Sequence, residues 1–144
     1  MLNRILETLK NDNAIMFIPA DDKAVRFTSS MLNSHYFSPI PPNYISLLKF
    51  SDGLIWNGVE LFGTRSHERE KYGYILPGII EINLEFLGYE FFTGKVILGR
   101  VAEELFVFDA RERKYLIIDR LDFSISSSFV SFSEALYLFV DDLF

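Results

Sequence analysis

The amino-acid sequence predicts an α+β fold, a mostly antiparallel sheet with N-terminal helices and a C-terminal helix packed against it. Three observations lead to this prediction. Apolar residues recur at helical spacing in residues 2–51, short β-prone runs follow one another between residues 96 and 118, and helical spacing returns after residue 131. No internal repeat or linker-like segment is visible, so residues 1–144 are expected to form a single domain.

The first predicted element is a short amphipathic helix that begins at Leu2. Its apolar residues share one face: Leu2, Ile5, Leu6 and Leu9. The polar run Asn11-Asp12-Asn13 is expected to end it. The next run, Ala14 to Ile18, stops at Pro19 and is too short to distinguish a strand from an extended packing segment, and we favour the extended segment.

A second helix is predicted from Asp21 to about Leu32. Asp21 suits the N-cap position, and Asp22 places a favourable negative charge in the first turn. One stripe of this helix carries Ala24, Phe27, Thr28, Met31 and Leu32. Residues 33–40 contain Ser, His and Pro and form a linker to the next helix.

The segment from Pro41 to Gly63 predicts a helix, a turn and a strand in close succession. Pro42 suits a first helical position because its φ is already helical and the N–H it lacks would have no partner there. The buried face is expected to carry Tyr44, Leu47, Leu48 and Ser51. Gly53 can adopt the left-handed conformation that ends a helix, and Asn57-Gly58 is a turn signal before a strand at Val59 to Phe62.

The middle of the chain shows weaker patterns. Residues 63–78 are rich in charge and glycine, and the mixed-sign run from His67 to Lys71 indicates a solvated excursion from the sheet. Ile79 to Asn83 is predicted to be a strand. Residues 85–94, with the sequence EFLGYEFFTG, are predicted to form a loop that packs aromatic rings on the core.

The second half predicts an antiparallel meander followed by a helix. The β-prone runs are Val96 to Leu98, Leu105 to Phe108 and Tyr115 to Ile118. Asp109 to Lys114 is then a hairpin connection, and residues 124–128 lead into the last helix. That helix begins with a capping box made by Ser131 and Glu134.

The balance of charges favours a basic partner and disfavours nucleic acid. With 14 basic and 20 acidic residues the formal charge is 14 − 20 = −6, which is opposite in sign to a phosphate-binding surface. The absence of cysteine excludes disulfides and thiolate metal sites and fits a reducing compartment. Residues 1–10 do not resemble a signal peptide, and no run approaches the ~20 apolar residues that cross a bilayer. We therefore expect a cytoplasmic protein that does not bind membranes.

Aromatic residues are unusually frequent, with 15 Phe, 7 Tyr and one Trp making 16% of the chain. Most must fill the core, and a surplus would form a protein-binding patch. Trp56 lies between a helix end and the Asn57-Gly58 turn, so it is either an exposed binding anchor or a ring folded over the core with its N–H satisfied. The same two alternatives hold for Tyr89, Phe91 and Phe92.

No motif indicates a catalytic or metal centre. His35 and His67 are far apart, and neither belongs to a ligand-spaced cluster. The serines of residues 124–131 lie outside any G-x-S-x-G elbow, and no G-x-x-x-x-G-K-[ST] phosphate loop occurs. We predict that the protein is not an enzyme and holds no metal or cofactor.

No pair of neighbouring acids is placed as the two carboxylates of a glycosidase must be. Glu103 and Glu104 would point to opposite faces of a strand, and Asp141-Asp142 do not converge either. Glu60 with Asp109 is geometrically possible, and the alternative is that both are ordinary surface acids. A hydrolase would also need a deep pocket that holds both acids.

Several segments in order resemble the SUKH superfamily, which includes fungal cell-wall glucan-synthesis regulators and bacterial proteins associated with toxin immunity. The matching segments are Asp21 to Leu32, Pro41-Pro42-Asn43-Tyr44 with Leu47-Leu48, Ser51-Asp52-Gly53, Glu60-Leu61-Phe62-Gly63, the Val96 to Asp109 hairpin, and Ser128 to Leu136. Asp52 stands where the family typically has Asn, and the segment from Arg65 to Lys71 has no counterpart in the family pattern.

The resemblance implies a non-catalytic protein-binding domain and, for bacterial members, an immunity protein that neutralises a cognate toxin by direct binding. The acid excess favours a basic toxin domain as the partner. The candidate partner-binding residues are Trp56, Asp52, Glu60, Glu103, Glu104 and Asp109. The alternative is a regulatory scaffold in cell-wall polysaccharide synthesis.

Overall fold

The computed structural model describes residues 1–69 and 74–140 and has the α+β fold that the sequence predicts. Among these residues the helices are α1 (Leu2–Asn11), α2 (Asp22–Ser34), α3 (Pro42–Phe50), α4 (Ile79–Leu84), the 3-10 turn η2 (Glu90–Phe92) and α5 (Phe132–Phe139). The strands are β1 (Ile15–Met16), β2 (Leu54–Trp56), β3 (Val59–Leu61), β4 (His67–Arg69), β5 (Tyr74–Leu76), β6 (Lys95–Val101), β7 (Glu104–Asp109), β8 (Lys114–Asp119) and β9 (Ile125–Phe129).

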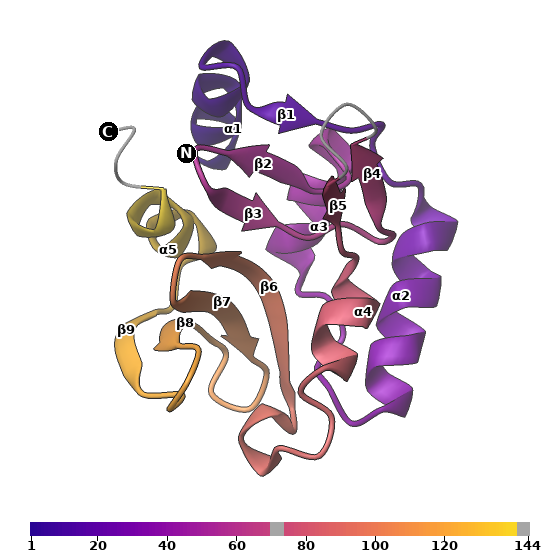
Figure 1. Cartoon of the computed structure of the whole chain (residues 1–144), viewed down its shortest axis with the longest axis vertical. Coiled ribbons are helices and arrows are strands. Elements are labelled where there is room, and N and C mark those ends of the chain that lie inside the picture. The colour runs from indigo at the N-terminus through magenta and orange to yellow at the C-terminus, as the bar shows by residue number, and fades with distance from the viewer. Residues whose placement is uncertain (70–73, 141–144) are drawn as a thin grey trace.

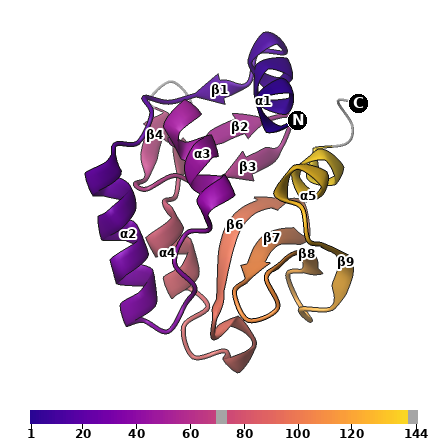
Figure 2. The same cartoon turned by 180° about the vertical axis from the view of Figure 1, so that it is seen from behind.

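One antiparallel sheet organises the described part of the chain, with seven strands in the order β1-β2-β3-β6-β7-β8-β9. Strands β4 and β5 form a separate hairpin beside it. Figure 1 shows α2 and α4 side by side along one flank, and α4 packs against both α2 and β6. Figure 2 shows α3 over the opposite face of β2 and β3, while α5 packs against β8 and β9.

One buried hydroxyl group joins helix α3 to two strands of the sheet. Tyr44 of α3 is fully buried, and its hydroxyl donates to the carbonyl oxygens of Phe62 (2.6 Å) and Leu98 (3.0 Å). Burial raises the pKa of Tyr44 well above its ordinary value, because the phenolate would lose its hydration. The two hydrogen bonds tie α3 to the end of β3 and to β6, so the helix predicted from the Pro42 segment is part of the core.

Several local predictions are confirmed, and each has the expected cause. The Asp21 carboxylate accepts from the Ala24 N–H at 2.7 Å at the start of α2. The Ser131 hydroxyl accepts from the Glu134 N–H at 3.3 Å at the start of α5. Asn57 and Gly58 have φ values of 47° and 82°, as the tight hairpin between β2 and β3 requires.

The predicted strand at Ile79 to Asn83 is wrong, because these residues form α4. Its β-branched residues favoured a strand, but strand propensity is overridden by tertiary contacts, and here Asn83 contacts β6 from within a helix. The Asn83 amide accepts from the Ile97 N–H (2.8 Å) and donates to the Ile97 carbonyl oxygen (3.0 Å), so it occupies both backbone groups of that residue. These bonds lie at the register shift between Ile97 and Gly99, where β6 departs from regular pairing.

Four other predictions need correction. The segment from Ala14 to Ile18 is not merely an extended packing segment, because it contains strand β1, which pairs with β2. Residues 124–128 do not simply lead into the last helix, because β9 pairs with β8 there. Gly53 has the predicted left-handed φ of 88°, but α3 already ends at Phe50 and the glycine serves the turn into β2. Phe27 is exposed, and the buried stripe of α2 consists of Val25, Thr28 and Leu32.

Candidate functional site

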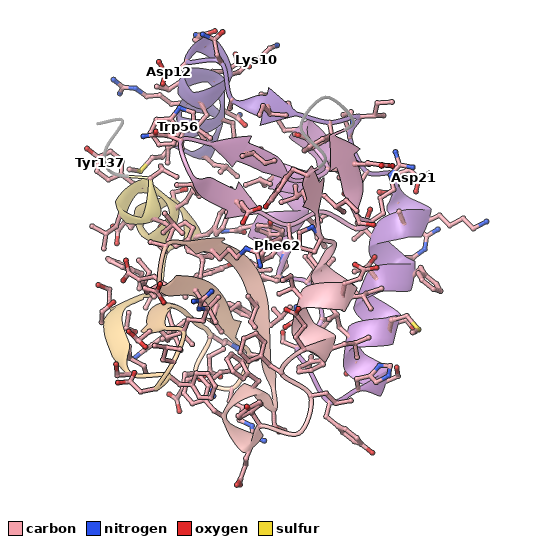
Figure 3. The ribbon with its side chains drawn as sticks, viewed as in Figure 1. Lys10, Asp12, Asp21, Trp56, Phe62 and Tyr137 are labelled. Carbon is pink, nitrogen blue, oxygen red and sulfur yellow. The ribbon has the colours of Figure 1, made fainter. Side chains whose placement is uncertain are left out.

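Trp56 lies in the core, which settles the two alternatives for its position. Its side chain is 7% exposed, and its indole N–H donates to the Asp12 carboxylate at 2.8 Å. Figure 3 shows this pair at the end of α1, beside Lys10. A ring with so little exposed area offers little surface to a partner, so the predicted binding anchor is a structural residue.

Asp52 is 2% exposed and is occupied by neighbouring donors. One oxygen accepts from the N–H (2.7 Å) and hydroxyl (2.9 Å) of Thr64, and the other lies 2.9 Å from Nε2 of His67. The His67 ring stacks on Phe17 with centroids 4.1 Å apart. The prediction of a solvated excursion is therefore wrong for His67, which is buried in β4. Residues 70–71 of that run lie outside the described residues.

Glu60 and Asp109 are held at opposite ends of β6. Glu60 pairs with Arg100 (Nε to Oε1 2.5 Å), and Asp109 lies 3.8 Å from Nζ of Lys95. Their partners are 100 − 95 = 5 positions apart on one strand, which is roughly 16 Å at the usual rise. Paired glycosidase acids are separated by about 5 to 9.5 Å, so Glu60 and Asp109 do not form such a pair.

The remaining predicted acids stabilise turns and strand edges. Glu103 pairs with Arg120 of the β8–β9 turn at 3.0 Å, and Glu104 accepts from the Ser126 hydroxyl at 3.3 Å. Asp109 caps the β7–β8 turn by accepting from the N–H groups of Arg111 and Glu112. The predicted site residues thus do not all converge: Glu60, Glu103 and Glu104 lie near the Arg100 end of β6, whereas Asp109 lies at its other end. The prediction for Asp141-Asp142 lies outside the described residues.

A different part of the described surface has a hollow of about 340 Å³ lined largely by aromatic and apolar side chains. Its exposed large apolar and aromatic members are Tyr36 (77%), Tyr89 (54%) and Leu87 (51%). Its other lining residues are His35, Phe37, Gly88, Glu90 and Thr93. We call this set the Tyr36 surface. It joins the end of α2 to the connection between α4 and β6 (Figure 1).

The backbone of Tyr36 is held in a conformation that glycine usually adopts. Tyr36 has a φ of 69°, its N–H donates to the Asn33 carbonyl, and the Phe37 N–H donates to the Leu32 carbonyl. These two bonds define a Schellman motif with Tyr36 at the left-handed C′ position. Helix α1 ends in the same way but uses Asn13, a residue that tolerates this conformation. A tyrosine at this position therefore lowers the stability of the helix end relative to glycine or asparagine, and its ring is exposed.

The other wall of the hollow rests on a rigid aromatic cluster. Tyr89 packs edge-on against Phe123 (5.4 Å between centroids), and Phe92 packs against Phe86 and Phe123 (4.9 Å each). The alternatives left open for this loop now separate: Phe92 is buried, Phe91 is half-buried and Tyr89 is exposed. The loop does pack rings on the core as predicted, and it also leaves one ring available to a partner.

The described lining of the hollow carries one acidic side chain, the exposed Glu90, and no Lys or Arg. Sequence reasoning missed Tyr36, although one signal was present: a bulky residue directly after a helix end, where Gly or Asn is usual.

Comparisons with known proteins assign no family to the chain. No protein-family model matches the sequence, and no curated protein matches it. Among the described residues no helix has the length and apolar character needed to cross a membrane, and no group of three or more His, Asp or Glu side chains is placed to hold a metal ion. The fold and the Tyr36 surface therefore carry the functional inference.

Proposed function

We propose that this chain is a non-catalytic protein-binding domain that acts as an immunity protein, neutralising a cognate toxin by direct binding. One observation carries the proposal: a strained backbone presents the Tyr36 ring to solvent. A left-handed conformation costs an L-residue roughly 1–2 kcal/mol. The cap needs the left-handed backbone but not an exposed tyrosine at that position, and strain of this kind clusters at functional sites.

The composition of the Tyr36 surface supports a protein as the ligand. Tyrosine is enriched at protein interfaces because its rigid ring buries much apolar area at a low cost in conformational entropy. Tyr36, Leu87 and Tyr89 provide that area, and Glu90 provides a polar edge. The negative edge and the net charge of −6 favour a partner with a basic surface.

The resemblance to the SUKH superfamily supports the immunity role. The segments that carry it occupy α2, α3, β3, the β6–β7 hairpin and α5 in the order of the chain. The family includes bacterial immunity proteins, and a small acidic domain suits direct covering of a basic toxin surface. A regulatory scaffold in cell-wall polysaccharide synthesis uses the same kind of surface and is the alternative outcome of the experiment.

The experiment is to capture partners from the producing cell with tagged wild-type protein and to assay them. Secreted proteins encoded beside this gene are also tested as candidate toxins. We expect a toxin whose activity is abolished by an equimolar amount of the wild-type chain. The double variant Tyr36→Ala/Tyr89→Ala should inhibit it at least tenfold less well.

The matched control is Ile18→Ala, which removes an exposed apolar side chain outside the Tyr36 surface. This variant should inhibit like the wild type. Specific recovery of polysaccharide-synthesis proteins without a toxin would contradict the immunity role and support the scaffold. Turnover of any substrate by the purified chain, lost on one point substitution, would contradict a non-catalytic domain.

A further inference from the structure

We infer that the hollow of the Tyr36 surface receives an arginine side chain of the partner protein. This inference rests on the proposed protein-binding function and names the chemistry that the hollow recognises. Tyr36 and Tyr89 supply aromatic faces, and Glu90 supplies a carboxylate on the lining. Aromatic faces and a carboxylate together attract a cation, and a guanidinium group interacts with both at once.

The lining contains acceptors and no competing Lys or Arg. Nδ1 of His35 lies 2.8 Å from the Met31 carbonyl oxygen. A carbonyl oxygen only accepts, so Nδ1 carries a hydrogen and is not itself an acceptor. Lys95 and Arg111, the cations of the adjoining strand and turn, do not line the hollow. An incoming cation therefore meets the Glu90 carboxylate there without a competing Lys or Arg on the lining.

The connection between α4 and β6 already binds one cation of the chain itself through an aromatic ring and an oxygen acceptor. Nζ of Lys95 lies 4.4 Å from the centroid of the Phe91 ring and donates to the Phe91 carbonyl oxygen at 2.8 Å. Phe91 and Tyr89 lie in the same segment, but Phe91 faces the chain's own lysine whereas Tyr89 is exposed. The exposed ring offers a partner the contact that the half-buried ring makes internally.

Arginine fits the hollow better than lysine or an apolar side chain. Its planar guanidinium stacks on aromatic rings and presents parallel N–H groups to a carboxylate, whereas an ammonium is a compact, strongly hydrated charge. An apolar side chain would gain no interaction with the Glu90 carboxylate, and an acidic one would be repelled.

The hollow is preorganised on the Tyr36 side. The Gly94 N–H donates to the Tyr36 carbonyl at 2.8 Å, and the Ser38 N–H donates to the Lys95 carbonyl at 3.0 Å. These bonds fix the end of α2 against the start of β6. Binding therefore needs little ordering of the backbone, which reduces its entropic cost.

The test is an NMR titration of the full chain with the peptide acetyl-Gly-Arg-Gly-amide and with its citrulline counterpart. Citrulline keeps the shape of arginine but carries no charge. We expect saturable amide shifts at Tyr36, Gly88, Tyr89 and Glu90 with millimolar affinity, roughly fivefold tighter for arginine than for citrulline. Equal affinity for the two peptides, or shifts confined to other residues, would overturn the inference.

Two variants locate the interaction. Glu90→Gln should weaken the arginine peptide roughly fivefold, and Tyr89→Ala roughly tenfold. Glu112→Gln, at an exposed glutamate of the β7–β8 turn, should leave the affinity unchanged. The dispersion of each NMR spectrum verifies that the variant is folded. Unchanged affinity in Glu90→Gln and Tyr89→Ala would place the peptide outside the hollow.

The outcomes for the hollow and for the immunity role are distinguishable. If the wild-type chain inhibits a toxin and Glu90→Gln and Tyr89→Ala inhibit it equally well, the arginine site is wrong and the immunity role stands. If the arginine peptide binds as expected but no toxin is inhibited, the site stands and the immunity role fails.

Discussion

The indole N–H of Trp56 donates to the Asp12 carboxylate at 2.8 Å and so joins strand β2 to the end of helix α1 (Figure 3). Asp12 is the C-cap residue of that helix and is exposed. A residue that sequence reasoning offered as a partner contact therefore connects two elements of the fold. The effect of changing it should appear in stability rather than in binding.

Trp56→Phe should lower the free energy of unfolding by about 1 kcal/mol, because one hydrogen bond is lost while most of the apolar area is kept. Trp56→Ala should cost roughly 3–5 kcal/mol because it leaves a cavity. Urea unfolding measures both. Asp12→Asn is the control, because its amide oxygen still accepts from the indole. Loss of partner binding by a folded Trp56→Phe protein with unchanged stability would contradict this role.

Tyr36→Gly should raise the free energy of unfolding by about 1 kcal/mol, since glycine suits the left-handed C′ position. Tyr36→Ala removes the same ring but keeps a Cβ, so its stability should stay within about 0.5 kcal/mol of the wild type. Both variants should bind the partner weakly. Asn13→Gly at the end of α1 is the control, and its gain in unfolding free energy should be smaller because asparagine already tolerates the left-handed conformation. A glycine variant less stable than the alanine variant would show that Tyr36 is not strained.

Local signals predicted much of the fold because their causes are local. Caps such as Asp21 and Ser131, and turns such as Asn57-Gly58, act within a few residues of themselves. The meander followed from short β-prone runs, and it is present as β6, β7 and β8. In these regions the order of helices and strands could therefore be predicted without knowledge of the packing.

The errors arise where a distant contact decides the outcome. Ile79 to Asn83 is helical because Asn83 bonds to Ile97 of β6, and His67 is buried because Asp52 accepts a hydrogen bond there. The Tyr36 surface was not predictable for the same reason. Tyr36 and Gly94 are far apart in sequence and are joined by one backbone hydrogen bond. Sequence patterns identified the exposed ring of Tyr89 only as one of two alternatives.

Asn83→Ala should lower the free energy of unfolding by roughly 2–4 kcal/mol, because the buried N–H and carbonyl of Ile97 lose their partner. Urea unfolding measures the loss, and hydrogen exchange of the Ile97 amide should accelerate more than that of other β6 amides. The control is Asn33→Ala, at an exposed asparagine of α2, which should be nearly neutral. Equal stability of the two variants would contradict this account of the register shift in β6.

Alkaline pH should unfold the protein through its buried tyrosines. Burial raises the pKa of Tyr115 from 10.0 to about 12. Because the folded-state pKa lies above the unfolded value, this contribution to stability is complete below pH 10 and is lost as the pH rises to about 12. Urea unfolding between pH 8 and 12 measures the loss, and Tyr115→Phe should show a smaller one. A profile that is identical in Tyr115→Phe would exclude this residue as a cause.

Asp52→Ala should destabilise the fold by roughly 3 kcal/mol without changing partner affinity in the folded protein. The substitution leaves the Thr64 N–H, the Thr64 hydroxyl and the His67 ring without their common acceptor in a buried place. Asp52→Asn keeps an oxygen for Thr64, and its amide donates to Nε2 of His67 when the ring proton is on Nδ1. Its cost should therefore be only about 1 kcal/mol. Urea unfolding ranks the variants, and calorimetry with the captured partner tests affinity. If a folded Asp52→Asn protein bound the partner tenfold more weakly, Asp52 would be a partner-binding residue after all.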